Sequence, residues 1–141
     1  MYNRLQKISI LFYFVSLFTP IFKGSDAIGI LALLTGWMGY LTFFIYHELP
    51  SIDCLAWTAN IIYFSIFFFS KKKKNIRVAL SLITLIFGLL AFNIKKVEVD
   101  IEGTLGDVTP GFGFFCWLVS FVLMFIYNLN LERVNGDYKI N

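Results

Sequence analysis

The chain consists of long apolar stretches separated by short polar segments. Five stretches contain no Asp, Glu, Lys or Arg, and their apolar residues run continuously instead of alternating with polar ones. Such runs are typical of membrane-crossing helices, because in lipid the backbone must satisfy its own hydrogen bonds. A strand of a membrane β-barrel would be shorter and would alternate in polarity. The predicted helical segments cover residues 8–22, 27–46, 54–70, 78–94 and 111–129.

The composition agrees with lipid as the main solvent. Apolar residues make up 58% of the chain and charged residues 15%, whereas soluble domains have about 45–50% and about 25%. A soluble protein of 141 residues could not cover so much apolar surface with so few polar side chains. We therefore expect an all-α fold, a polytopic transmembrane helical bundle that forms a single domain over residues 1–141.

Basic residues are concentrated between the third and fourth apolar stretches, in Lys71–Lys74 and Arg77. Cytoplasmic loops of membrane proteins carry an excess of Lys and Arg, so this segment is expected in the cytoplasm together with the C-terminus. The expected location is a bacterial inner membrane, with the lipid bilayer as one partner. A nucleic-acid patch is the rival interpretation of a basic run. Apolar stretches flank this run closely, so we set nucleic acid aside as a partner.

The basic residues also bear on the number of crossings. With four crossings the N-terminus is cytoplasmic, and residues 27–46 form a re-entrant or interfacial helix on the outer side. Nine of the 12 basic residues then lie inside, and Lys23, Lys95 and Lys96 lie outside. With five crossings eight lie inside and four outside, the N-terminal pair among the latter. This bias favours four crossings. Five remain the alternative, because an uncharged run as long as 27–46 normally spans.

The outer connection between the fourth and fifth stretches alternates apolar and acidic residues. Period 2 is a strand pattern, so a small extracytoplasmic β-hairpin is expected within residues 96–109, with Val108–Pro110 as the returning segment. Three acids on one face could contact a cation or a partner. Alternatively, they form a solvated face that keeps the loop out of lipid. These acids are Glu98, Asp100 and Glu102.

A few polar and aromatic residues near the outer ends of the spans are candidate interface residues. Trp57 and Trp117 suit the membrane–water boundary, because the indole ring is apolar and its N–H can stay hydrated. A ligand-stacking role is the alternative. Asn60 lies deeper, where a polar side chain usually bridges helices and less often binds a ligand. Cys54 and Cys116 are expected as free thiols, with a disulfide as the alternative.

The sequence contains no catalytic constellation. His47 is the only histidine, so it cannot build a metal site alone, and no partner for a Ser or Cys nucleophile is evident. No predicted span holds a charged residue well inside it, which disfavours active ion transport. We expect no enzymatic activity, no catalytic or metal-binding residues and no cofactor.

Four short blocks resemble those of a group of small bacterial multi-pass inner-membrane proteins that has no assigned activity. The resemblance implies the same multi-pass helical architecture and no particular chemistry. It adds Trp37, in the second block, to the candidate interface residues. The blocks are Tyr13-Phe14-x-Ser16-Leu17-x-x-Pro20, Ala32-Leu33-Leu34-x-Gly36-Trp37-x-Gly39, Ala56-Trp57-x-Ala59-Asn60 and Gly113-Phe114-Phe115-x-Trp117-Leu118-x-Ser120.

These observations favour a non-enzymatic protein that acts through protein–protein contacts in the membrane. One alternative is a bacteriocin-immunity-like protein that blocks a pore-forming toxin. Another is an accessory subunit of a channel or transporter. All three functions predict another membrane protein as partner, and the sequence does not specify the oligomeric state.

Overall fold

The computed structural model describes residues 2–24, 28–46, 49, 51–69, 73–98 and 105–130. The chain is mostly helical, with two small two-stranded sheets. The elements are α1 (Tyr2–Leu17), β1 (Phe22–Lys23), α2 (Gly29–Thr35), η1 (Gly36–Met38), α3 (Gly39–Tyr46), α4 (Ile52–Ser65), η2 (Ile66–Phe68), α5 (Lys74–Leu90), η3 (Ala91–Asn93), β2 (Lys96–Glu98), β3 (Leu105–Asp107), β4 (Thr109–Pro110) and α6 (Phe112–Leu129).

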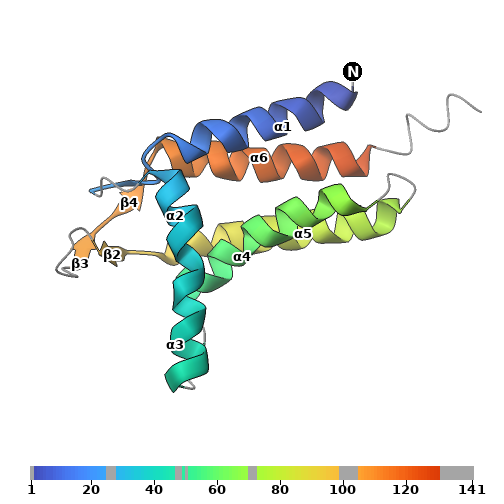
Figure 1. Cartoon of the computed structure of the whole chain (residues 1–141). Coiled ribbons are helices and arrows are strands. Elements are labelled where there is room, and N and C mark those ends of the chain that lie inside the picture. The colour runs from blue at the N-terminus through green and yellow to red at the C-terminus, as the bar shows by residue number, and fades with distance from the viewer. Residues whose placement is uncertain are drawn as a thin grey trace, which may run out of the picture.

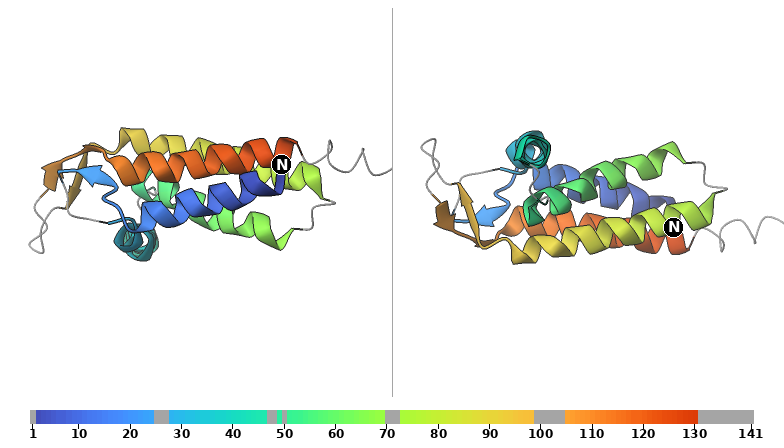
Figure 2. Two further views of the ribbon diagram at one scale, coloured as in Figure 1. Left: turned by 90° about the horizontal axis from the view of Figure 1, so that it is seen from above. Right: turned by 90° about the horizontal axis from the view of Figure 1, so that it is seen from below.

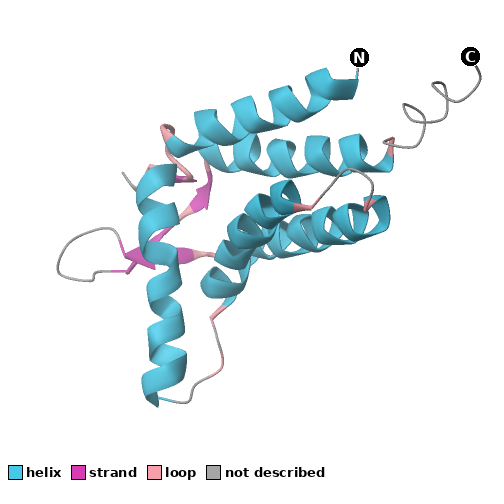
Figure 3. Ribbon diagram, turned by 45° about the vertical axis from the view of Figure 1, so that its right-hand side comes forward, coloured by secondary structure: helices cyan, strands magenta, loops and turns pink. Residues whose placement is uncertain are grey.

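Helices α1, α4, α5 and α6 form a bundle (Figures 1 and 2). Helix α1 packs against α6, α6 against α5, and α5 against α4. The start of α1, the end of α6, the end of η2 and the start of α5 lie at one end, here called the basal end. The strands lie at the opposite end, here called the sheet end (Figure 3).

A helical rod formed by α2, η1 and α3 crosses the bundle near the sheet end. It runs across the four bundle helices in Figure 1 and is seen nearly end-on in Figure 2. Two glycines allow the rod to lie close to the bundle. A Cβ at Gly29 would lie 2.1 Å from the carbonyl oxygen of Ser16, and a Cβ at Gly36 would lie 2.3 Å from Cδ1 of Trp57. The rod is therefore seated directly on α1 and α4.

The two sheets organise the sheet end. Strands β2 and β3 form the hairpin expected within 96–109, and Lys96 pairs with Asp107 in an antiparallel register. The returning strand is Leu105–Asp107, so the expected return over Val108–Pro110 is wrong. Thr109–Pro110 instead pairs with Phe22–Lys23, which ties the segment after α1 to the segment before α6.

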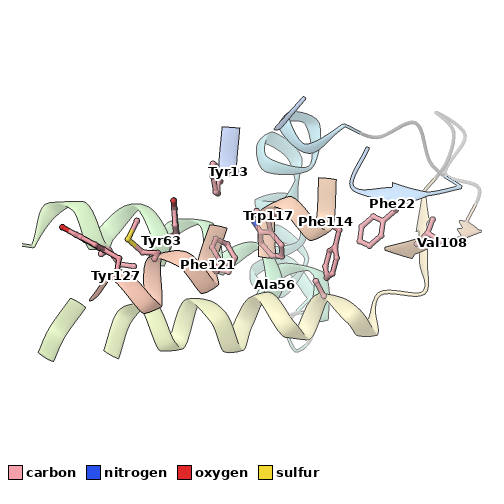
Figure 4. Close-up of a cluster of buried hydrophobic side chains, with 13 residues drawn as sticks. Tyr13, Phe22, Ala56, Tyr63, Val108, Phe114, Trp117, Phe121 and Tyr127 are labelled. Carbon is pink, nitrogen blue, oxygen red and sulfur yellow. The ribbon is translucent and has the colours of Figure 1, made fainter. Parts of the chain in front are cut away.

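A column of aromatic side chains fills the bundle axis (Figure 4). Tyr63 stacks on Tyr13 with ring centroids 4.9 Å apart and lies 5.3 Å from Phe121. Phe121 in turn lies 4.6 Å from Trp117. The column continues through Phe114 to the small sheets. Edge-to-face and offset contacts of this kind contribute about 0.5–1.5 kcal/mol beyond area burial.

Polar side chains are buried in the bundle, while many large apolar side chains face outward. Helix α5 shows this most clearly, because its buried residues recur at the three- and four-residue spacing of one helix face while its exposed face is Leu- and Ile-rich. An amphipathic helix of a soluble protein has the reverse pattern. The buried polar side chains in the described residues are Ser9, Ser16, Asn60, Arg77, Ser81, Thr84, Ser120 and Asn128. Exposed apolar side chains on the bundle include Leu11, Phe14, Phe18, Ile61, Phe64, Leu82, Ile83, Ile86, Leu89 and Phe115.

The predicted segments correspond to helices with shifted ends. The first helix covers Tyr2–Leu17 and not 8–22, because Pro20 cannot donate a backbone hydrogen bond and restricts the residue before it. Within the described residues, two helices are long and apolar enough to cross a membrane, namely Lys74–Asn93 and Phe112–Leu129. Helix length and apolar composition alone therefore do not support four membrane spans.

Candidate functional site

A polar network lies in the sheet-end half of the bundle, on the aromatic column. Its centre is Asn60, which is 7% exposed. The Oδ1 atom of Asn60 accepts hydrogen bonds from the Tyr13 hydroxyl at 2.9 Å and from Nε1 of Trp117 at 2.8 Å. Its Nδ2 donates to the Trp57 carbonyl at 3.1 Å. A single amide therefore links α1, α4 and α6.

A second set of hydrogen bonds lies one turn away along the column. The Ser9 hydroxyl donates to the Ser120 carbonyl at 2.7 Å. Since that bond uses its only proton, the Tyr63 hydroxyl donates to Ser9 Oγ at 2.8 Å. This set joins the same three helices, so the contact of α1 with α4 and α6 is specified by polar groups as well as by packing.

A cavity of about 450 Å³ lies next to Asn60, between the rod and the bundle. This volume is within the range of about 300–1,000 Å³ that is usual for small-molecule sites. Helices α1, α4 and α6 and the β2–β3 hairpin contribute to its wall, and α2 and η1 cover it. Its aromatic lining is Tyr13, Phe22, Trp57, Phe114 and Trp117.

Trp57 fixes the rod over this cavity. Its Nε1 donates to the Leu33 carbonyl of α2 at 2.8 Å, and its ring lies beneath Gly36. Farther along the rod, the Tyr40 hydroxyl contacts the Thr58 hydroxyl and the Cys54 carbonyl. The N–H groups of both Trp57 and Trp117 thus bond to protein atoms, whereas the boundary interpretation of these residues expected them to stay hydrated.

Two charged residues line the cavity where it meets the surface, and both are exposed. Asp53 lies in the first turn of α4, and Lys96 begins β2. Partial burial raises the pKa of the Asp53 carboxyl above its ordinary value of 3.8, and a backbone hydrogen bond at the same residue opposes the rise. Side chains of opposite charge therefore border the opening.

Arg77 forms a second polar centre, at the basal end. Its side chain is 2% exposed, although the sequence placed it with the lysines of a solvated hairpin. Its Nε donates to Oδ1 of Asn128 at 3.1 Å, and Nη1 donates to the carbonyls of Ile66 at 3.1 Å and Phe69 at 2.9 Å. These carbonyls end the α4–η2 helix, where a cation is favoured. Arg77 lies just before the predicted span 78–94, so it is a buried charge in the first turn of α5 and not one well inside a predicted span.

Arg77 also lies over a tyrosine ring. Its Cζ lies 5.9 Å from the ring centroid of Tyr127, within the range of a cation–π contact. Within the described residues, Nη2 of Arg77 and the hydroxyl of Tyr127 are buried without a hydrogen-bond partner. Arg77 is thus held by carbonyl, amide and ring contacts instead of an acid.

The other candidate residues are spread over the sheet end. Trp37 lies in η1 and is 45% exposed, outside the cavity lining. Glu98 ends β2, while Asp100 and Glu102 lie outside the described residues. The structure therefore brings Trp57, Asn60 and Trp117 together and leaves Trp37 apart from them.

The described cysteines are free. Cys54 and Cys116 are both buried and unpaired, which confirms the expectation of two thiols. In the described residues no group of three or more His, Cys, Asp or Glu side chains is placed to hold a metal ion. The arrangement can therefore enclose an apolar body and present two opposite charges at its opening.

Comparison with protein-family models, curated proteins and solved structures finds no match to this chain. Its function is therefore inferred from its own residues.

Proposed function

We propose that this chain is a multi-pass protein of a bacterial inner membrane that works without catalysis, through contacts made at its sheet end. The observation that carries the proposal is the placement of polarity. Burying Ser, Thr, Asn and Arg while exposing Leu, Ile and Phe along the bundle is unfavourable in water, because many large apolar side chains then stay in contact with water. In lipid the same arrangement satisfies polar groups internally and leaves apolar groups in their preferred solvent.

Four crossings fit this bundle better than five. Four helices lie together, and the start of α1, the Lys74 end of α5 and the end of α6 share the basal end (Figure 1). An even number of crossings is required if both ends of the bundle chain lie on one side. The positive-inside rule then makes the basal end cytoplasmic, since Lys73, Lys74 and Arg4 lie there.

The rod supports the interfacial alternative for residues 27–46. It lies across the bundle helices (Figures 1 and 2) and is seated by close contacts at Gly29 and Gly36. In the four-crossing arrangement the rod lies on the outer side, near the plane of the head groups. Such a helix would keep its polar and apolar groups at the boundary between lipid and water.

The rod is also the surface best suited to a protein partner. Its exposed apolar side chains recur at three- and four-residue spacing, which places them on one face, and α3 extends away from the bundle in Figures 1 and 3. Exposed contiguous apolar surface marks sites of protein or membrane contact. Its exposed large apolar residues are Leu31, Leu34, Trp37, Met38, Leu41, Phe44 and Ile45.

Single-cysteine labelling tests the topology. Cysteines placed at Ser25, Ser51, Asn75, Thr104 and Asn135, in a background with both native cysteines replaced by alanine, are treated with an impermeant maleimide on intact cells. We expect labelling at Ser25, Ser51 and Thr104 and protection at Asn75 and Asn135. Protection of Ser25 alone would support five crossings. Labelling of Asn75 from outside would overturn both arrangements.

Photocrosslinking in cells tests the contact function. A photoreactive residue at Leu34 or Ile45 of the rod is compared with one at Leu82 on the exposed face of α5. We expect a discrete protein adduct from the rod positions and lipid adducts alone from Leu82. Equal adducts at all three positions would contradict a specific surface on the rod. Identification of the adduct then separates a resident channel or transporter from a toxin.

A further inference from the structure

The hydrogen-bonding groups inside the cavity have partners within the protein. Ser16 donates to the Tyr13 carbonyl at 2.6 Å, and Thr35 donates to the Leu31 carbonyl at 2.9 Å. Trp57 and Trp117 donate their N–H groups to Leu33 and Asn60, as described above. A ligand body therefore meets few groups that require a polar partner. The interior is chemically suited to an apolar chain, because apolar contacts leave no buried donor unsatisfied.

The charged groups of the cavity lie at its opening. Asp53 and Lys96 are exposed and line the same cavity. No salt bridge is recorded for either of them within the described part of the chain. A cation and an anion beside one opening complement a head group that carries one charge of each sign. A phosphate would face Lys96, and an ammonium group would face Asp53.

The cavity is large enough for a small-molecule ligand. Its volume of about 450 Å³ lies within the range of about 300–1,000 Å³ that is usual for such sites. An apolar ligand of that size class, such as one acyl chain, therefore suits it.

From these features we propose that the cavity binds one acyl chain of a zwitterionic phospholipid, with the head group between Asp53 and Lys96. The inference rests on the proposed membrane location and outer position of the sheet end. Since the chain leaves lipid to enter the cavity, little hydrophobic free energy is gained. The head group and the fit of the cavity therefore supply the selectivity, and the bound lipid lies beneath the rod.

Quenching of tryptophan fluorescence in nanodiscs tests the proposal. The probe is palmitoyl lysophosphatidylethanolamine with a spin label on its acyl chain. One variant, Trp37→Phe, keeps the two cavity tryptophans, and another, Trp57→Phe with Trp117→Phe, keeps only Trp37. We expect saturable quenching at one probe per chain in the first variant and a linear rise in the second. Linear quenching in both would overturn the proposal, because it reports partition into the bilayer alone.

A filled cavity provides the matched comparison. Ala32 lines the cavity, whereas Ala79 is exposed on α5 outside it. In a Trp37→Phe background we expect Ala32→Phe to weaken saturable quenching at least tenfold and Ala79→Phe to leave it unchanged. Slow alkylation of buried Cys54 in both variants verifies that the rod stays docked. Equal quenching in a docked Ala32→Phe protein would overturn the proposal.

The head group is tested by changing its charge. We expect the phosphatidylethanolamine probe to bind about threefold more tightly than its phosphatidylglycerol equivalent, as befits an exposed ion pair. Asp53→Asn should abolish this preference, and Lys96→Gln should weaken both probes. An unchanged preference in Asp53→Asn would contradict the assigned head-group position. If the labelling map shows Ser25 and Ser51 outside and saturable quenching is still absent, the lipid site fails while the membrane topology stands.

Discussion

Asn60 connects three helices through one side-chain amide. Its carbonyl oxygen accepts from both Tyr13 and Trp117, and its NH2 group donates within α4. Apolar packing alone cannot replace this acceptor. Both donors are buried, so without Asn60 their hydrogen-bonding groups would have no partner. The residue therefore determines how α1 and α6 sit against α4.

We predict that Asn60→Leu destabilises the protein by about 1–2 kcal/mol, since two buried donors lose their acceptor. The measurement is thermal unfolding in detergent. Asn93→Leu is the matched control, because the Asn93 amide is exposed and bonds only to the Leu90 carbonyl of its own helical segment. An equal loss in both variants would show that the network contributes nothing specific.

Arg77 stabilises the basal end by donating hydrogen bonds to the carbonyl of Ile66, where η2 begins, and to that of Phe69, which follows η2. We predict that Arg77→Met costs about 1–3 kcal/mol, because hydrogen bonds from a charged donor to Ile66 and Phe69 are lost while the cost of burying the charge is relieved. Arg77→Lys should be destabilising as well, since one ammonium group cannot reproduce the forked geometry of the guanidinium. Unfolding in detergent measures both variants, with exposed Arg4→Met as control. Full rescue by lysine would contradict this role.

At the residue scale, the sequence could indicate Asn60 but not Arg77. An amide side chain inside an apolar run implies a polar partner, and Asn60 has three. Arg77 follows four lysines and looks like part of a solvated run. Its burial depends on Asn128 and on carbonyls 8 and 11 residues away in the chain. Only the packing of α5 on α4 and α6 brings these groups together.

At the element scale, the rod depends on two glycines and one tryptophan. Gly36 lets the Trp57 ring pass beneath η1, and Trp57 then donates to Leu33. The sequence predicted that residues 27–46 could be interfacial, but it could not predict the direction of the rod relative to the bundle. That direction follows from the close contact of Gly29 with the backbone of α1 and of Gly36 with the Trp57 ring, and such contacts leave no periodic signal.

We predict that Gly36→Val undocks the rod and exposes Cys54. A new side chain would lie within the Trp57 ring, and overpacking of this kind costs about 1–3 kcal/mol. Cys54 is 1% exposed, and its Sγ lies 2.1 Å from where a Cβ of Gly39 would be. Its alkylation rate should rise about tenfold, since about 1.4 kcal/mol corresponds to that factor.

Cys116 is the internal control for this measurement, because it is buried on α6, which is not part of the rod. Mass spectrometry of alkylated peptides reports both thiols in one sample. Ala79→Val, on the exposed face of α5, should change neither rate. A parallel rise at Cys116 would indicate general unfolding instead of release of the rod.

The small sheets contain a second contact that could not be predicted from the sequence. Alternation of valine with acidic residues predicted β2 correctly, since period 2 is a local signal. The pairing of Phe22–Lys23 with Thr109–Pro110 joins segments far apart in the chain. Two-residue strands contain too few positions to show a period, so nothing local could reveal this contact.

At the scale of the whole molecule, the inverted polarity of the bundle is the property on which the membrane assignment depends. The apolar runs were visible in the sequence, but the side on which Ser81 and Thr84 would lie was not. The structure places them inwards and places Ile83 outwards, at 40% exposure near the middle of Lys74–Asn93. Position 83 therefore distinguishes lipid from water as the surrounding solvent.

We predict that Ile83→Lys opposes membrane insertion by about 3 kcal/mol, the cost of a lysine at the centre of a spanning helix. In water, an exposed lysine at this position would change stability by no more than about 0.5 kcal/mol. Insertion is measured by resistance of the full chain to alkaline extraction and by a glycosylation-based insertion assay of the α5 segment. Asn75→Lys, at the exposed basal end of the same helix, is the control and should insert normally. Unimpaired insertion of Ile83→Lys, with a soluble and folded product, would mean that α5 packs in water and that the bundle is not solvated by lipid.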